Sequence, residues 1–240
     1  MAFLVYMTLK FDPLLIPAQP TLSFELPLWE GGIKYVAGID EAGRGPLAGP
    51  VSAGAVILPC DPSICTRLHG VRDSKQMTPE DREYWANFLK GEAVSYGTGF
   101  ASSEEIDMLG IVPATHLAVQ RALSAMRVHA EHLLLDYIQL LQIPVPQTSI
   151  TKGDARCLSI AAASILAKTT RDALMCEMDS RYPGYGFARH KGYATRAHLS
   201  ALERLGPCPI HRYSFAPIRQ KQEDDLSAGV RPTQYVTEEL

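Results

Sequence analysis

The sequence predicts an α/β fold in which a mixed β-sheet is flanked by helices. Short apolar runs alternate with segments of helical spacing, in the order strand, strand, helix, strand, helix, strand, helix. With 240 residues and an ordinary apolar fraction, the chain is long enough to bury one sizeable core. The expected architecture is therefore a sheet with helices on its faces.

The first two strands are predicted at 35–41 and 51–58. Both runs are apolar, the second ends at Pro59, and a glycine-rich turn separates them, which favours a hairpin with a broad turn. The residues before them, 1–33, are rich in proline and lack clear periodicity. We expect this segment to be an N-terminal extension of the main domain at 34–221.

Cap signals place the next elements. Thr78 is a suitable N-cap and Pro79 suits the first helical position, so a helix is expected to run to about Lys90. A strand over 93–101 follows, and apolar residues at helical spacing predict a helix over 113–127.

The last elements are two strands and a long helix. The apolar run 131–136 ends in Asp136, and 148–151 is predicted as a brief strand. Asp154 opens an alanine-rich segment with strong helix propensity at 160–178. The polar residues 222–240 lack periodicity and are expected to form a disordered tail.

Composition points to the cytoplasm. The five cysteines include no C-x-x-C pair, so neither a disulfide framework nor a zinc site is supported. Lys10 and Asp12 interrupt the apolar N-terminus, and no run reaches the ~20 apolar residues that span a bilayer. We expect a cytoplasmic monomer with no membrane association.

Charge is unevenly distributed although the formal net charge is only -3. Between residues 181 and 221 the chain carries eight Lys or Arg residues and one acid, Glu203. This excess is either a basic footprint for nucleic acid or a solvated charged face.

Four acids fall at the ends of predicted elements: Asp40, Glu41, Asp136 and Asp154. Ligand sites in open α/β sheets collect at strand ends, and clustered carboxylates suit hard divalent cations. Two such ions about 4 Å apart form a clamp for phosphodiester hydrolysis. The alternative is that single aspartates here form turns or cap helices, as Asp154 could.

Strand geometry raises a difficulty for the Asp40–Glu41 pair. Successive strand residues point to opposite faces, so both side chains cannot face one site in a regular strand. Either the strand ends or bulges at Glu41, or Glu41 contributes its backbone carbonyl. The glycines at 43 and 45 make an irregular turn possible.

Residues 43–48 also fit the G-x-G-x-x-G/A dinucleotide pattern. That motif needs a helix after it, because the helix N-terminus holds the pyrophosphate. Here Pro46, Pro50 and a strand follow instead, which disfavours nucleotide binding.

Several motifs in a fixed order resemble those of the bacterial ribonuclease HII family, over roughly residues 20–220. They lie at 38–45, 73–75, 152–155 with 160–165, 190–193 and 206–212. The resemblance implies an RNase H-like fold with a small C-terminal helical portion at about 180–221. It also implies endonucleolytic cleavage of RNA in RNA–DNA hybrids, and of duplex DNA on the 5′ side of an embedded ribonucleotide, with Mn²⁺ or Mg²⁺ as cofactor.

The resemblance further implies roles for single residues. The catalytic and metal-binding acids would be Asp40, Glu41, Asp136 and Asp154. The glycine-arginine-glycine element that senses the ribose 2′-OH would be Gly43, Arg44 and Gly45, with Tyr193 as the stacking tyrosine. Phosphates would be held by Ser74, Lys75, Lys152 and Lys191.

One departure from the family pattern lies beside the acids, where Tyr137 follows Asp136 in place of a small residue, usually glycine. Two alternatives stay open. The chain could be another nuclease of the same superfamily, although the motifs at 43–45 and Tyr193 are not needed for a pure DNA substrate. It could also be a non-catalytic nucleic-acid-binding module, although all four acids are present.

Overall fold

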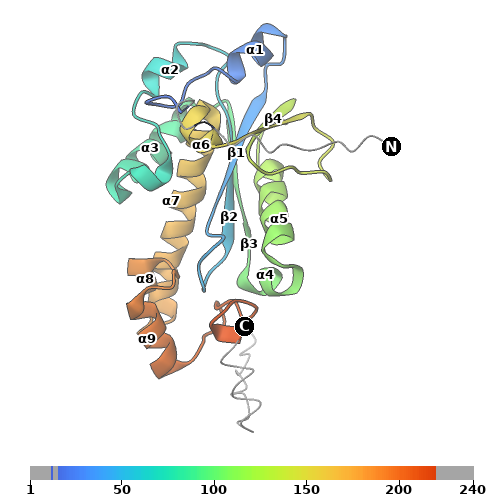
Figure 1. Cartoon of the computed structure of the whole chain (residues 1–240). Coiled ribbons are helices and arrows are strands. Elements are labelled where there is room, and N and C mark those ends of the chain that lie inside the picture. The colour runs from blue at the N-terminus through green and yellow to red at the C-terminus, as the bar shows by residue number, and fades with distance from the viewer. Residues whose placement is uncertain (1–11, 13–15, 220–240) are drawn as a thin grey trace.

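A five-stranded mixed sheet forms the centre of the computed structural model, which describes residue 12 and residues 16–219 (Figure 1). The strands are β1 (Val36–Ala42), β2 (Val51–Ile57), β3 (Ser95–Ala101), β4 (His132–Asp136) and β5 (Gln147–Ile150), in the spatial order β3-β2-β1-β4-β5. β1 pairs antiparallel with β2 and β2 with β3, whereas β4 pairs parallel with β1 and with β5. The predicted hairpin and mixed sheet are confirmed.

One helix covers each face of this sheet (Figure 1). The long helix α7 (Leu158–Arg181) packs on β1 and β2, and α5 (Ile111–Ser124) packs on β2 and β3 from the other side. Because both faces are covered, β2 is buried along its whole length. Two apolar clusters, one on each face, make up the main core.

Glycine lets α7 approach the sheet closely. A Cβ added at Gly38 would lie 2.1 Å from the backbone of Ser159, and one at Gly54 would lie 2.3 Å from the carbonyl oxygen of Ala163. The alanines at 161–163 complete this contact, since they are fully buried. Small residues on both elements therefore set the distance between α7 and the middle strands.

The upper part of the view in Figure 1 contains α1 (Glu25–Glu30), α2 (Ile64–Arg67), the 3₁₀ helix η2 (Ser74–Gln76) and α3 (Pro79–Glu92). The segment before β1 is not a bare extension over its described part. Leu22 and Trp29 join the core, and buried Glu25 accepts a hydrogen bond from the backbone N–H of Ser159. The prediction from proline content missed this helix, because its apolar residues join the core without a regular period.

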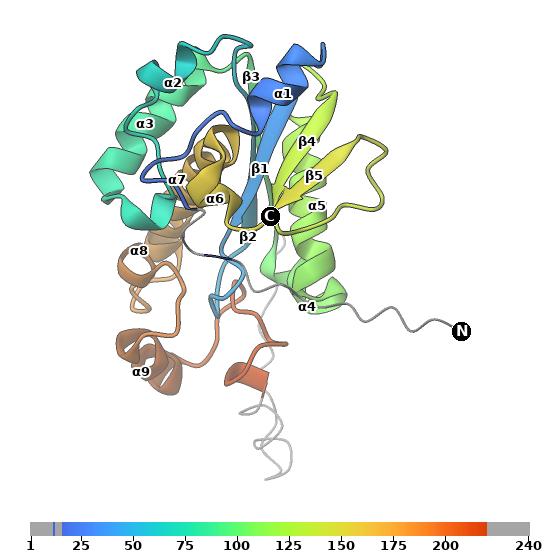
Figure 2. The same ribbon diagram turned by 45° about the horizontal axis from the view of Figure 1, so that its top comes forward.

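The C-terminal helical portion lies at one end of the sheet (Figure 2). It contains α8 (Phe187–His190) and α9 (Arg196–Leu205), while α4 (Ser103–Leu109) precedes α5. A third apolar cluster joins this portion to the β1–β2 connection through Leu47 and Ala48. The C-terminal helices are thus fixed against the loop that follows β1.

Helix and strand boundaries differ from the prediction by a few residues, with one larger change near Asp154. Asp154 does not begin the long helix but lies in the separate short helix α6 (Gly153–Arg156), and extended Cys157 separates the two. Among the described residues, no helix is both long and apolar enough to cross a membrane. The predicted tail, 222–240, lies outside the described residues.

Candidate active site

The four acids come together at one end of the sheet. Asp40 and Glu41 lie near the end of β1, and Asp136 is the last residue of the parallel neighbour β4. Asp154 lies in α6, directly after β5, and the N–H of the preceding Gly153 donates to Asp136 Oδ1 at 2.8 Å. Parallel pairing of β1, β4 and β5 therefore brings residues from distant parts of the chain together.

These carboxylates repel one another. Burial raises the pKa of Asp40 well above its usual value, and Glu41, Asp136 and Asp154 raise it further. Burial also raises the pKa of Asp136, with added repulsion from Asp154 and Glu41. Each acid is thus within electrostatic range of others, as the sequence predicts.

The strand that carries Asp40 and Glu41 is regular, contrary to the end or bulge considered from the sequence. The pairing register with β2 continues through Glu41 and Ala42, so the strand neither ends nor bulges at Glu41. Its Oε1 accepts a hydrogen bond from Arg44 Nη1 at 3.1 Å, whereas its Oε2 is buried with no partner among the described residues. The charge of Glu41 nevertheless raises the pKa of both Asp40 and Asp136, so its carboxylate lies within electrostatic range of both acids although the strand is regular.

The acid cluster fits divalent metal in charge and in donor type. Carboxylate and carbonyl oxygens are the ligands that Mg²⁺ and Mn²⁺ prefer, and the unpartnered Glu41 Oε2 and mutual repulsion mark a missing positive charge. Within the described ranges, no three His, Cys, Asp or Glu side chains already converge into a complete metal site. The four acids supply the negative charge, and bound ions would bring their carboxylate oxygens closer together.

Lys75 forms an ion pair with one of these acids. Its Nζ lies 3.2 Å from Asp154 Oδ2 and 4.0 Å from Asp73 Oδ1, at the start of η2. Burial alone would lower the pKa of Lys75, but the charges of Asp73, Asp154 and Asp40 outweigh it and raise it to about 12. Ser74 is buried, and its N–H donates to Ser164 Oγ, so the side chain of Lys75 is the more accessible of the pair.

Two buried arginines hold the loop after β1. Gly43 has a φ of 89°, and a Cβ there would lie 2.0 Å from Arg171 Nε, so this position requires glycine on both counts. Arg212 donates to the carbonyl oxygens of Gly43 and Arg44. Arg212 belongs to the basic segment 181–221, which is expected from the sequence to face nucleic acid or solvent. Its side chain is instead fully buried and reaches the loop.

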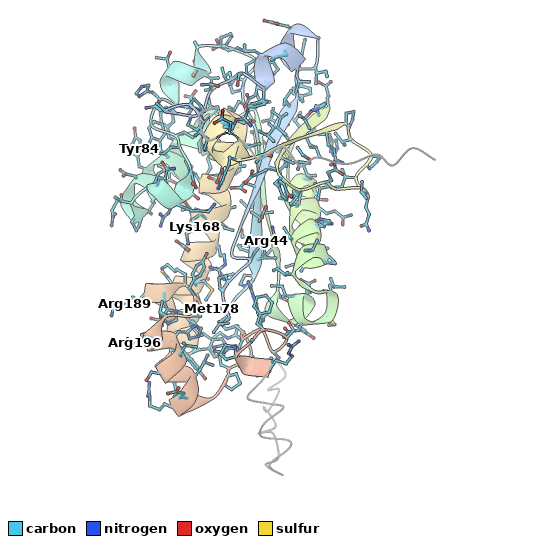
Figure 3. All side chains as sticks on the ribbon, viewed as in Figure 1. Arg44, Tyr84, Lys168, Met178, Arg189 and Arg196 are labelled. Carbon is cyan, nitrogen blue, oxygen red and sulfur yellow. The ribbon has the colours of Figure 1, made fainter. Side chains whose placement is uncertain are left out.

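Arg171, which lies against Gly43, also lies near Tyr193, so Tyr193 is close to this loop. Its ring is 43% exposed, and its centroid lies 6.0 Å from Arg171 Cζ and 5.7 Å from Lys168 Nζ. Figure 3 labels Lys168 on α7 and Arg44 at a similar level on the loop after β1. Tyr193 and the 43–45 loop, distant in sequence, thus meet at one region of the surface.

The remaining predicted contacts are less closely tied to the acids. Lys152 is exposed at the residue before α6 and adopts a left-handed conformation with a φ of 58°. The ammonium of Lys191 donates to Ala188 O at 2.5 Å and contacts Cys176 Sγ at 2.9 Å. Arg189 and Arg196, labelled in Figure 3, lie on the C-terminal helices, away from Arg44 in this view.

Three histidines pack together behind Tyr193. This cluster was not predicted from the sequence. The rings of His190 and His198 stack with centroids 4.4 Å apart, and His198 Nε2 lies 3.0 Å from His211 Nε2. His198 Nδ1 lies 3.0 Å from the carbonyl oxygen of Tyr193, to which it can only donate. His190 is buried, with Nε2 2.8 Å from Tyr185 O and Nδ1 accepting from Gly192 N–H, so it is not exposed to contact a phosphate.

Tyr137 stands where the family pattern has a small residue, usually glycine, and its backbone conformation is one that glycine adopts easily. It has a φ of 62°, a left-handed conformation that favours glycine, and its side chain is 79% exposed beside Asp136. Its backbone N–H donates to Ile150 O, which holds the turn in place. The chain therefore keeps the glycine-type backbone while carrying an aromatic side chain there.

Comparison with known protein sequences identifies the family of this chain. The family model for ribonuclease HII matches residues 37–218. A ribonuclease HII from Anaeromyxobacter sp. is 54% identical over 83% of this chain, which spans 62% of that relative's length. A second, from Dehalococcoides mccartyi, is 49% identical, and the match covers 83% of this chain and 94% of the relative.

Solved structures agree on the fold. The crystal structure of ribonuclease H2 from Pyrococcus horikoshii OT3 superposes with a TM-score of 0.64 at 28% identity, over 79% of this chain and 97% of that one. Bst-RNase HIII in complex with Mn²⁺ superposes with a TM-score of 0.59 over 91% and 76% of the two chains, and at 16% identity the likeness extends to the fold alone. The predicted RNase H-like fold is confirmed, and the chain belongs to the ribonuclease HII family.

Proposed function

We propose that this ribonuclease hydrolyses the RNA strand of RNA–DNA hybrids and cuts duplex DNA on the 5′ side of an embedded ribonucleotide. The observation that supports it best is the cluster of Asp40, Glu41, Asp136 and Asp154 beside a glycine loop. Family membership supports the reaction class, and the cluster supports the place where it occurs. Such an activity would serve the removal of ribonucleotides from DNA.

The acids would hold Mn²⁺ or Mg²⁺. When bound, these ions would activate the attacking water and stabilise the charge that develops on the scissile phosphate, leaving a 3′-OH and a 5′-phosphate. Buried Asp40 and Asp154 provide fixed anionic oxygens, and Gly153 N–H orients the Asp136 carboxylate. Lys75, which borders Asp154, would neutralise an adjacent phosphate.

Ribose would be recognised on the loop after β1. The exposed residues Arg44 and Gly45 have backbone N–H groups with no acceptor among the described residues, and a 2′-OH can accept from such donors. Tyr193 would pack on the same sugar through its exposed ring. Exposed Lys152 would contact the phosphate backbone, and Lys191 could do so after leaving Ala188 O.

We also propose that residues 34–221 form the catalytic domain and carry its catalytic and substrate-binding residues, with the described segment before β1 packed on it, and that the protein acts as a monomer in the cytoplasm. The described motifs all lie within this range. Deletion of 222–240 should leave the cleavage rate unchanged. Light scattering should give the mass of a single chain both before and after the deletion.

The direct test is a cleavage assay on duplex DNA that carries one ribonucleotide, with Mn²⁺ or Mg²⁺. We expect a single cut on the 5′ side of the ribonucleotide, no cut in the matched all-DNA duplex, and no cut after chelation of metal. Cleavage of the all-DNA duplex at a similar rate would instead favour a general nuclease of this superfamily.

A further inference from the structure

Arg171 and Arg212 are fully buried guanidinium groups without an ion-pair partner. Neither lies within 4.0 Å of an Asp or Glu oxygen in the described part of the chain, in contrast to Arg82 and Arg121. Their side-chain hydrogen bonds all end on backbone carbonyl oxygens. Buried charges in proteins are usually paired with opposite charges, so this arrangement requires an explanation.

The carbonyl groups that they bind belong to the elements proposed to read ribose. Arg212 Nε donates to Gly49 O at 3.0 Å and Nη1 donates to Arg44 O at 2.8 Å, while Nη2 donates to Gly43 O. One planar guanidinium thus fixes three carbonyls of the loop after β1. A lysine could not reproduce this, because its ammonium is a single point of donation.

Arg171 connects the same loop to the segment that carries Tyr193. Its Nε donates to Pro50 O at 2.8 Å and its Nη2 to Ala48 O at 3.1 Å, both in the β1–β2 connection. Its Nη1 donates to Lys191 O at 3.0 Å, two residues before Tyr193. The side chain also fills the space that a Cβ at Gly43 would need.

Burial has lowered the pKa of both groups. Desolvation lowers the pKa of Arg212 to about 9, with a further contribution from the charge of Arg171. Desolvation also lowers the pKa of Arg171. The charges of Asp107 and Asp172 favour the charged forms of Arg212 and Arg171, respectively, but do not cancel the cost of burial. The fold therefore retains two buried cations behind one loop at a cost in free energy, and their hydrogen bonds to the loop carbonyls offset that cost.

We propose that Arg171 and Arg212 are positioning residues for ribose recognition. Arg212 holds the carbonyls of Gly43 and Arg44 on the buried side, so that the N–H groups of Arg44 and Gly45 remain for the substrate. Arg171 sets the distance between this loop and Tyr193. This inference rests on the proposed function, because it assigns the loop and Tyr193 to the ribose.

The test compares Arg212→Lys and Arg171→Lys with the matched control Arg121→Lys. Arg121 pairs with Glu105 and donates to Phe100 O on the α5 side of the sheet, far from the loop in sequence. All three are placed in an Asp40→Asn background with Mg²⁺, so that substrate persists during binding. Kd is measured for a duplex with one ribonucleotide and for the same duplex in all-DNA form, alongside the thermal unfolding midpoint.

The two arginine variants should lose about tenfold of the preference for the ribonucleotide duplex, the factor associated with one hydrogen bond of this kind. Their Kd for the all-DNA duplex should change less than twofold, because both charges are retained and neither is exposed. The control variant should keep the parent's preference.

A lower unfolding midpoint with an unchanged ribonucleotide preference in both variants would overturn the inference and leave the arginines a purely structural role. If Arg212→Lys fails to fold, Arg171→Lys alone decides, since it acts on the same loop through different carbonyls. A parent protein with no preference for the ribonucleotide duplex would instead refute the proposed function, whatever the variants do.

Discussion

Two neighbouring regions of this protein bury charge in opposite ways. At the end of the sheet, four carboxylates gather; the pKa values of Asp40 and Asp136 are raised, and one oxygen, Glu41 Oε2, is left without a partner among the described residues. Behind the loop after β1, Arg171 and Arg212 are buried as cations, but their donors are engaged by backbone carbonyls. In the first region Lys75 and Arg44 pair with Asp154 and Glu41, but Asp40 and Asp136 form no ion pair within the described residues, whereas the second region has its hydrogen bonds satisfied.

This difference separates chemistry from positioning. An unsatisfied acidic cluster gains free energy when a cation arrives, so it is suited to metal-dependent hydrolysis. A satisfied cationic pair gains little from a new ligand and instead rigidifies the backbone around it. The predictions below disturb one region and leave the other intact.

The largest effect is expected from Asp40→Asn. The variant keeps the shape of the side chain and loses its charge, so cleavage should fall on the order of a thousandfold, or about 4 kcal/mol. Without metal the variant should be at least as stable as the parent at pH 7, since it removes one of several repelling carboxylates. Single-turnover cleavage and calorimetric unfolding measure both quantities, and near-normal turnover at saturating Mg²⁺ would refute the metal assignment.

The second-largest effect is expected from substitutions of Tyr193, which should lower the cleavage of substrate more than the stability of the fold. Tyr193→Phe keeps the ring and loses one polar contact, a deficit of about 1–3 kcal/mol in kcat/KM. Tyr193→Ala should lose more, because the ring is also removed, while the unfolding midpoint moves little for a side chain that is 43% exposed. The measurement is kcat/KM on a duplex with one ribonucleotide, and an early-melting Tyr193→Ala that cuts normally while folded would contradict it.

Acid should weaken the histidine cluster behind Tyr193. Burial lowers the pKa of His198 and His211 to about 4, from 6.5 for a free histidine. The unfolded chain therefore binds more protons, so the stability is present above pH 6.5 and is lost as the pH falls toward 4, by up to about 1.4 kcal/mol per pH unit for each histidine. The carboxylates with raised pKa act in the opposite direction.

Urea unfolding at pH 7, 6 and 5 measures this slope. The parent should lose stability on acidification, and the double variant His198→Asn with His211→Asn should show a flatter dependence. Equal slopes in the two proteins would show that the histidines titrate normally and do not support the Tyr193 segment in neutral form.

The smallest effect is expected at Lys75, which pairs with Asp154 and would compete there with bound metal. Removing its ammonium in Lys75→Met should lower the metal concentration for half-maximal activity by a few-fold, while the maximal rate falls because a phosphate contact is lost. A titration of activity against Mg²⁺ separates the two changes. A higher metal requirement would show that Lys75 helps to assemble the acids.

Much of the fold could be predicted from local signals. The hairpin of β1 and β2, the Thr78 cap of α3 and the alanine-rich α7 all follow from short-range chemistry, and the structure has them within a few residues. Helix α1 could not be predicted, because buried Glu25 depends on a partner in α7 and Trp29 depends on a core built by distant segments. Tertiary contacts, not helix propensity, place this segment.

For the site, the sequence could locate charges but not their partners. Strand ends predicted where the four acids meet, because parallel strands align their carboxyl ends. Burial could not be predicted for Arg212, which reads as one more cation of a basic segment until its carbonyl partners in the loop are known. The same holds for His190, whose partners Tyr185 and Gly192 are set by the local turn.

The most direct measurement for the contrast between the two regions is thermal unfolding during titration with Mg²⁺ or Mn²⁺. The parent and Arg212→Lys should both gain stability as metal fills the acid cluster, and Asp40→Asn should gain little. The contradicting result is an equal metal-induced shift in Asp40→Asn and the parent, because the acids at the end of the sheet would then not hold the metal.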